Sequence, residues 1–382
     1  MKGSFKIAVI LGIPVNIHWT FLLIFVYIYA LGSMSSAASS MTLEYMVLIL
    51  VLFACVLLHE FGHALMARRF GVSTHDIILS PIGGIARLSK LPEKPMQEFL
   101  VAIAGPAVNL AIALVLAPFY YLLIPGNDRL SLVNNFFNNN GNYFAPDLSF
   151  GGFLIVGLFW LNIVLAIFNL IPAFPMDGGR VLRAGLSLRF PRVAATRYAA
   201  LIGKIFAGLF ILFGLLSQPM NLLYVFIGVF IIITASSELR MVRIEHLMKT
   251  KTIRDLLKDR PFRLYQDEAI GIAQEHYKAN RQYNFLIYDR WENPIGILPE
   301  QEVLRLSKAK DFDPGQAIGR DYLSPMTMTI HESVDLNAAY QAVGGEPHQV
   351  AVVFNDGGQA IGVVDRITLN QFLRNGVKRR KN

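Results

Sequence analysis

The stretch YMVLILVLFACVLLHEFGHALM, residues Tyr45–Met66, decides the fold of this 382-residue chain. It is uncharged from Tyr45 to Leu58 and has the length, about 20 residues, that a helix needs to cross the hydrocarbon core of a bilayer. The run ends in His59-Glu60-Phe61-Gly62-His63. Ionisable side chains near the hydrocarbon region are costly and are seldom kept without a function. The stretch therefore predicts a membrane-spanning helix with a functional site at one end.

The composition of the whole chain agrees with a membrane protein. It is 54% hydrophobic and only 16% charged, and its mean hydropathy is +0.44, whereas soluble domains carry about a quarter charged residues. The single cysteine, Cys55, excludes an internal disulfide and any multi-cysteine metal site. The net charge of +8 predicts basic rims on membrane helices and no nucleic-acid partner, because the chain is so apolar.

Six apolar runs are candidate membrane spans: Ile13–Leu31, Tyr45–Met66, Phe99–Leu123, Phe153–Ile171, Ala199–Leu216 and Leu222–Ser236. Clusters of basic residues follow the second, fourth and sixth runs, whereas the opposite connections contain Arg129 alone. Because cytoplasmic loops carry an excess of Lys and Arg, this alternation predicts about six transmembrane helices with both termini in the cytoplasm. We expect a multi-pass protein of the cell membrane.

The chain changes character after about residue 240. Two segments, Asn284–Leu298 and Gln349–Val364, each contain a strand-like run, a turn rich in Asp, Asn or Gly, and a second strand-like run. A helix-like stretch follows each. This pattern predicts a duplicated α/β unit of about 60 residues, with repeats over about 246–306 and 322–377. We therefore expect a membrane domain over 1–240 and a second domain over 241–382.

The pair His59 and His63 has the spacing of metal ligands. Residues i and i+4 lie on the same face of a helix, so both imidazoles can bind one ion. Zinc suits them because it takes neutral nitrogen ligands in tetrahedral geometry. Glu60 can take a proton from water acidified by the metal. The alternative is a chance match of five residues.

A catalytic zinc needs a third protein ligand, and the best candidate is Asp177. It lies in NLIPAFPMDGGR, residues Asn169–Arg180, where Pro172 and Pro175 break the helix. A carboxylate on broken backbone at membrane depth is tolerated only where it faces protein or a wet cavity. The alternative is that Asp177 caps a cytoplasmic helix that begins near Arg180, and these residues alone leave both interpretations open.

The segment Ile77–Leu88 is too short to span a membrane and is interrupted by Pro81, Gly83 and Gly84. It predicts a short membrane-associated β-hairpin close to the histidine-bearing helix. An exposed strand edge there can hold an extended substrate by main-chain hydrogen bonds; the alternative is an ordinary hairpin that covers the helix end. We interpret His18 as a packed or interfacial histidine rather than a ligand.

Three motifs in this order and spacing resemble the site-2 proteases, zinc metalloproteases that work inside the membrane. The motifs are His59-Glu-Phe-Gly-His63, Gly105-Pro-Ala-Val-Asn109, and Asn169 with Pro172 and Asp177-Gly-Gly. The resemblance implies that His59, His63 and Asp177 hold one zinc ion and that Glu60 is the catalytic base. It also implies that Asn169 orients substrate or steadies the oxyanion. Asn109 matches as well, although hydrogen bonding between helices is an alternative role for it.

Residues His246 to Arg374 resemble a pair of CBS domains, modules that occur as regulatory attachments. The resemblance implies an adenine nucleotide as ligand or a homodimer through the pair. Nucleotide-binding CBS modules often carry Ser or Thr and then Asp after the second strand. Neither Gly296–Glu302 nor Gly362–Thr368 has that pair, which counts against a nucleotide.

The predicted function is regulated intramembrane proteolysis by a zinc metalloendopeptidase that cuts transmembrane protein substrates in the lipid bilayer. The competing hypothesis is a CBS-regulated ion transporter or channel in which the His, Asp and Asn cluster lines a pathway. Glu60 separates the two, because a transport site can use it as a ligand whereas a hydrolase needs it free as a base. An inactive scaffold is disfavoured because the base and all the expected ligands are present.

Overall fold

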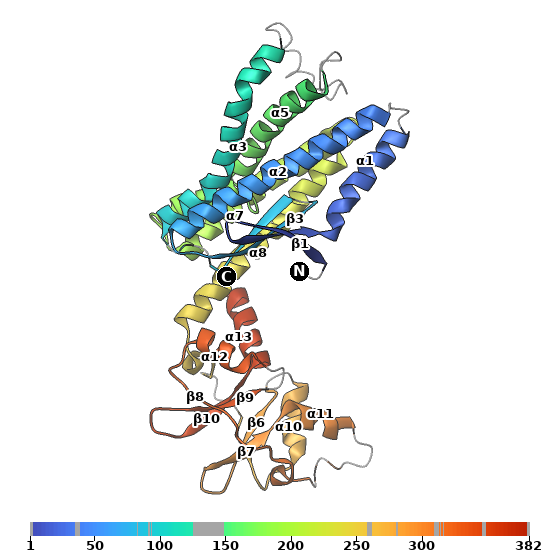
Figure 1. Ribbon diagram of the computed structural model, residues 1–382. Helices are drawn as coiled ribbons and strands as arrows, with labels where there is room; N and C mark the ends of the chain where they lie inside the picture. Colours follow the sequence, from blue (N-terminus) through green and yellow to red (C-terminus); the bar gives the residue numbers. More distant parts are fainter. Residues whose placement is uncertain are drawn as a thin grey trace. The chain divides into compact units, whose positions relative to one another are not determined.

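The computed structural model describes residues 3–34, 39–81, 83–90, 92, 94–124, 149–257, 262–279, 282–308, 313, 315, 317–345 and 349–379. The chain divides into two compact units, Met1–Leu239 and Arg240–Asn382. Helices dominate the first unit, and two small sheets with short helices make up the second (Figure 1).

Five helices among the described residues are long and apolar enough to cross a membrane. They are α2 (Ser39–Arg69), α3 (Pro95–Leu123), α5 (Phe150–Leu170), α7 (Arg192–Leu216) and α8 (Leu222–Thr250). In the first unit α2 packs against α3, and α3 packs against α5 (Figure 1). The polytopic helical fold expected from the apolar runs is therefore confirmed.

The prediction for the first apolar run, Ile13–Leu31, is wrong at its start. Residues Ile13–His18 form strand β2, Trp19–Phe21 form a 3-10 turn (η1), and helix α1 begins only at Leu22 and ends at Met34. Ile13 and Val15 are buried whereas the residue between them is half-buried, an alternation that suits a strand. With 13 residues α1 is about 20 Å long, short of the ~30 Å hydrocarbon core.

Strand β2 belongs to a four-stranded sheet with the order β1-β2-β3-β4. Strand β1 covers Ser4–Ile10, β3 covers Thr74–Ser80 and β4 covers Gly83–Leu88. Strands β3 and β4 are antiparallel, so the predicted hairpin is present, and β2 joins it by parallel pairing with β3. The sheet packs on α2 through an apolar cluster of Ile13, Val15, Phe61, Ala64 and Ile77.

A charged cluster on β3 ties three strands together. The buried carboxylate of Asp76 accepts a hydrogen bond from Asn16 Nδ2 on β2 at 2.7 Å and another from Arg87 Nε on β4 at 2.5 Å. The hydrogen bond from Arg87 holds the pKa of Asp76 below its usual range. The carboxylate is therefore charged across the neutral pH range and links β3 to both β2 and β4.

Helix α6 (Asp177–Ser187) follows an irregular segment, Ile171–Met176, after α5. Its Arg183 is fully buried and forms ion pairs with Glu98 on α3 and Glu238 on α8. Arg183 Nε donates to Glu98 Oε1 at 2.7 Å. A buried charge is tolerated only when it is paired, so this cluster holds α6 against two spanning helices.

The second unit contains the predicted duplication. The first repeat comprises β5 (Leu264–Tyr265), α10 (Ile270–Lys278), β6 (Phe285–Tyr288), β7 (Pro294–Leu298) and α11 (Glu300–Lys308). The second comprises β8 (Thr329–His331), α12 (Leu336–Val343), β9 (Val350–Phe354), β10 (Ala360–Asp365) and α13 (Arg366–Arg379). In each repeat the first strand is parallel and the third antiparallel to the middle strand. The repeats share an apolar cluster that joins Leu286 and Ile297 to Val352 and Val363.

Replacement of Arg183 by Ala leaves the buried Glu98 and the half-buried Glu238 without their cation. Breaking a buried ion pair in this way costs about 3–5 kcal/mol, so we expect a clearly lower midpoint of thermal unfolding for the purified protein in detergent. The matched control is Arg189→Ala, which removes an exposed arginine from the segment just after the same helix and should leave the midpoint unchanged. Equal midpoints for the two variants would show that the buried cluster does not stabilise the unit.

Candidate metal centre

The two histidines lie one helical turn apart near the carboxyl end of α2. His59 and His63 are each only 6% exposed. Their Nε2 atoms are 3.1 Å apart, and their rings meet edge to face with centroids 4.7 Å apart. Both imidazoles therefore direct the same nitrogen toward one point inside the first unit.

Asp177 brings a carboxylate to that point from 114 residues further along the chain than His63. Its Oδ2 lies 3.2 Å from His59 Nε2 and 3.1 Å from His63 Nε2. Helix α6 begins at Asp177 itself, and Met176 occupies the N-cap position. The alternative role as cap of a helix beginning near Arg180 is therefore not what the structure contains.

A close backbone approach puts Asp177 in place. A Cβ on Gly178 would lie 2.3 Å from the carbonyl oxygens of Leu170 and Ile171, a distance that no side chain tolerates. Only glycine lets the chain fold back this tightly after α5. The first turn of α6 can therefore start beside the histidines.

The other ring nitrogen of each histidine is already engaged. His63 Nδ1 lies 2.7 Å from the carbonyl oxygen of Val101, which can only accept, so this nitrogen carries the proton. His59 Nδ1 is hydrogen-bonded to Asn109 Oδ1. Both Nε2 lone pairs are thereby left for a metal, the arrangement usual for histidine ligands. Asn109 thus contacts the site and also joins α2 to α3.

The chemistry and the packing of this group fit a zinc ion. Two imidazole nitrogens and one carboxylate oxygen are the donor types of catalytic zinc sites, and among the described residues these three form the one such group of His, Cys, Asp or Glu. A Cβ on Gly105 of α3 would lie 2.3 Å from His63 Nε2 and 2.6 Å from His59 Nε2. A side chain at this position would therefore occupy the space beside the ligand atoms.

A cavity of about 550 Å³ opens beside the group. Its lining includes Glu60 and Asn169, both singled out from the sequence, together with residues of β4 and Arg180. Glu60 Oε2 accepts a hydrogen bond from the backbone N–H of Ala86 on β4 at 2.9 Å. The carboxylate thus lies in the cavity wall without joining the three converging atoms.

One buried polar residue connected to the metal group, Asn162, was not predicted from the sequence. Asn162 on α5 is 0% exposed and accepts a hydrogen bond from Asn109 Nδ2 at 2.9 Å. A polar residue within an apolar run was the available signal. His18, in contrast, lies outside the metal group: its Nδ1 is 2.7 Å from Thr20 Oγ1 at the start of η1.

Comparison with known proteins shows the family of the chain. The family model of Peptidase family M50 matches residues 47–146 and 147–214 of this chain. The zinc metalloprotease MJ0392 of Methanocaldococcus jannaschii is 37% identical over 270 residues, which are 71% of this chain and 70% of that protein.

Two solved structures are also similar to parts of the chain. The site-2 protease from Methanocaldococcus jannaschii shares 36% identity and covers 62% of this chain and 94% of that chain, with a TM-score of 0.43. The CBS domain of a bacterial CNNM/CorC family Mg²⁺ transporter shares 12% identity over 36% of this chain and 82% of that chain, with a TM-score of 0.29.

The family match decides between the hypotheses drawn from the sequence. It contains the histidine pair on the spanning helix α2 and Asp177 at the start of α6. A peptidase family favours hydrolysis over the ion transporter or channel. The chain belongs to peptidase family M50, the family of the site-2 proteases, and is a membrane metalloprotease.

Proposed function

We propose that His59, His63 and Asp177 bind one zinc ion and that Glu60 transfers protons in the hydrolysis of peptide bonds within or beside transmembrane segments of other membrane proteins. The observation that carries this proposal is the convergence of three buried donor atoms within 3.2 Å of one another. Both histidines offer Nε2 because their Nδ1 atoms are occupied.

Zinc supplies a Lewis acid that polarises a peptide carbonyl and acidifies water. Glu60 then takes a proton from the attacking water on its carboxylate and delivers it to the leaving amine nitrogen. The bond from water oxygen to the carbonyl carbon forms, and the C–N bond breaks. Asn169 lines the same cavity, so its amide can donate to a substrate oxygen and orient the scissile bond.

The free edge of β4 is the proposed docking site for substrate backbone. β4 is the last strand of its sheet, and Gly84, Ala86 and Leu88 line the cavity. The N–H of Ala86 points to Glu60 and hence away from β3. An extended peptide can pair with such an edge through main-chain hydrogen bonds, which requires the substrate segment to leave its helix.

The same sheet supports a cytoplasmic location for both chain termini. Arg68 and Arg69 end α2, and β3 follows within a few residues. β2 pairs with β3, so the amino-terminal strands lie on the side of these basic residues. Basic residues also follow the apolar part of α8, and an excess of Lys and Arg is typical of the cytoplasmic side.

Replacement of Glu60 by Gln should abolish proton transfer and leave the metal ligands intact. We expect cleavage of a transmembrane test substrate to fall by roughly 10²–10⁴-fold, while zinc content measured by atomic absorption stays near one ion per chain. A Glu60→Gln protein that purified without zinc and still cut the substrate would contradict these roles.

Variants of the proposed zinc ligands provide the matched comparison for Glu60→Gln. His59→Ala and Asp177→Ala should each lose zinc and activity together, because each removes one of three protein donors. Zinc retained at full occupancy in both variants would place the metal elsewhere in the chain.

A substrate series can test the requirement for unwinding. Gly costs a helix about 1 kcal/mol relative to Ala, which corresponds to roughly fivefold in an equilibrium. Substrates that differ by one Gly→Ala change next to the cut site should therefore be cleaved several-fold more slowly for each change. Equal rates of cleavage across the series, measured in the same detergent, would contradict docking on β4 in an extended form.

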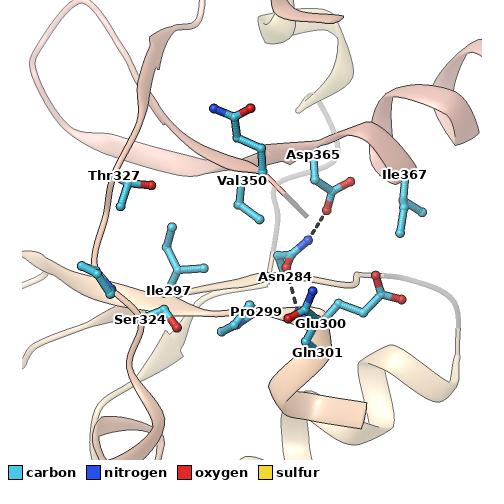
Figure 2. A pocket seen from close by; sticks show the side chains of 12 residues that line it. Asn284, Ile297, Pro299, Glu300, Gln301, Ser324, Thr327, Val350, Asp365 and Ile367 are labelled. Carbon is cyan, nitrogen blue, oxygen red and sulfur yellow. Dashed lines mark hydrogen bonds between the residues drawn. The ribbon is translucent and has the colours of Figure 1, made fainter. Parts of the chain in front are cut away.

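We assign residues 1–240 to the metalloprotease domain and 241–382 to a regulatory CBS pair, which can also support a homodimer. A cleft of about 380 Å³ lies between the two repeats (Figure 2). Its lining includes the carboxylates of Glu300 and Asp365, and none of the described residues that line it is Lys or Arg. Such a lining repels phosphate groups, so we propose that adenine nucleotides bind there only weakly.

The side chain best suited to a ribose is already occupied. Asp365 accepts from the N–H of Thr368 at 2.6 Å and from Asn284 Nδ2. Asn284 Oδ1 in turn accepts from the N–H of Glu300 at 2.8 Å (Figure 2). Asn284 therefore links the two repeats across the cleft, and a ribose must displace it to reach Asp365.

Calorimetry of the full-length protein in detergent can test the charge argument. We expect adenosine to bind at least as tightly as ATP, because only ATP brings phosphate charge into the cleft. Glu300→Gln removes one negative charge and should strengthen ATP binding without changing adenosine binding. Micromolar binding of ATP by the unmodified protein, with no binding of adenosine, would contradict this proposal.

A further inference from the structure

A chain of buried amides runs from α5 to the candidate metal centre. Asn162 Nδ2 donates to the carbonyl oxygen of Leu158 at 2.8 Å, and Asn162 Oδ1 accepts from Asn109 Nδ2 at 2.9 Å. Asn109 Oδ1 is hydrogen-bonded to His59 Nδ1. Asn109 and Asn162 are both 0% exposed. Three helices, α2, α3 and α5, are thus joined by one line of hydrogen bonds.

The carbonyl oxygen of Leu158 determines which atom donates and which accepts in every hydrogen bond of this line. The carbonyl oxygen of Leu158 can only accept, so the amide nitrogen of Asn162 must face it and the amide oxygen must face Asn109. Asn109 must then present its nitrogen to Asn162 and its oxygen to His59. Because an amide oxygen can only accept, His59 must carry its proton on Nδ1. The lone pair of Nε2 is therefore free.

We propose that Asn162 is a positioning residue that sets the orientation of Asn109 and, through it, the tautomer and ring orientation of His59. This inference depends on the proposed function, in which His59 Nε2 is a zinc ligand. Asn162 does not belong to the described lining of the 550 Å³ cavity, so it acts without touching substrate. Without Asn162, the Asn109 amide can turn over and donate to Nδ1, which moves the proton to Nε2 and blocks the ligand atom.

A merely structural role is the alternative, because buried asparagines also hold transmembrane helices together. The two roles differ in what can replace the amide. A carboxylate at position 109 has an oxygen on both sides and accepts from His59 Nδ1 whichever way it turns. Asn109→Asp should therefore restore zinc binding in a variant that lacks Asn162 if Asn162 orients Asn109. If Asn162 only holds helices together, Asn109→Asp should not restore zinc binding.

The test measures zinc affinity by competition with a chelator, and the visible spectrum of the Co²⁺-substituted protein, for the full-length chain in detergent. Asn162→Leu should weaken zinc binding by 10–100-fold, the range for loss of a partner behind a metal ligand, and alter the Co²⁺ spectrum. The double variant Asn109→Asp/Asn162→Leu should recover zinc affinity to within a few-fold of the unmodified protein. Thr196→Val, which removes a different buried hydrogen bond, should change neither property.

Unchanged zinc affinity in folded Asn162→Leu, or no recovery in the double variant, would overturn the proposal. Thermal unfolding reports whether each variant is folded. If Asn162→Leu does not fold, the variant to measure is Asn162→Asp. Its carboxylate still accepts a hydrogen bond from Asn109, so it should keep the zinc affinity of the unmodified protein. Weak zinc binding by folded Asn162→Asp would also overturn the proposal. Failure of the proposed function is distinct, since the unmodified protein would then bind zinc no more tightly than His59→Ala does.

Discussion

The structure of the first unit depends on the burial of three candidate ligand atoms at one point. Two imidazole nitrogens and a carboxylate oxygen lie within 3.2 Å of one another on residues less than 9% exposed. Polar groups in such surroundings are stable only when they are satisfied. Two glycines let the neighbouring elements approach: Gly105 of α3 leaves room beside the histidines, and Gly178, the second residue of α6, lets that helix start close to the end of α5.

This requirement also explains the polar residues that surround the site. Arg183 is buried between Glu98 and Glu238, six residues after Asp177 on a helix of eleven residues. A short helix after an irregular segment has little intrinsic stability, so its position is set by tertiary contacts. The ion pairs hold α6, which carries Asp177, and the amide line from Asn162 reaches His59.

The sequence predicted those parts of the site that depend on local spacing. His59 and His63 are one turn apart on one helix, so their partnership follows from helix geometry alone. Asp177 is far away in the chain, and the residues alone left its role open until the motifs were compared with the site-2 proteases. Asn162 was missed because one asparagine in an apolar run is typical of helix packing too. The sequence predicts helix over Ile13–His18, where the structure has strand β2, because a continuous apolar run does not distinguish the two.

The hydrogen bond between Glu60 and the N–H of Ala86 has a consequence for the order of events. A backbone N–H is one donor, and a strand that pairs with β4 at Ala86 brings a carbonyl oxygen to the same hydrogen. The substrate carbonyl oxygen and the Glu60 carboxylate therefore compete as acceptors for the N–H of Ala86. In the proposed mechanism, binding of the substrate backbone to β4 therefore releases the Glu60 carboxylate toward the reacting atoms, and without an extended peptide Glu60 stays bonded to Ala86.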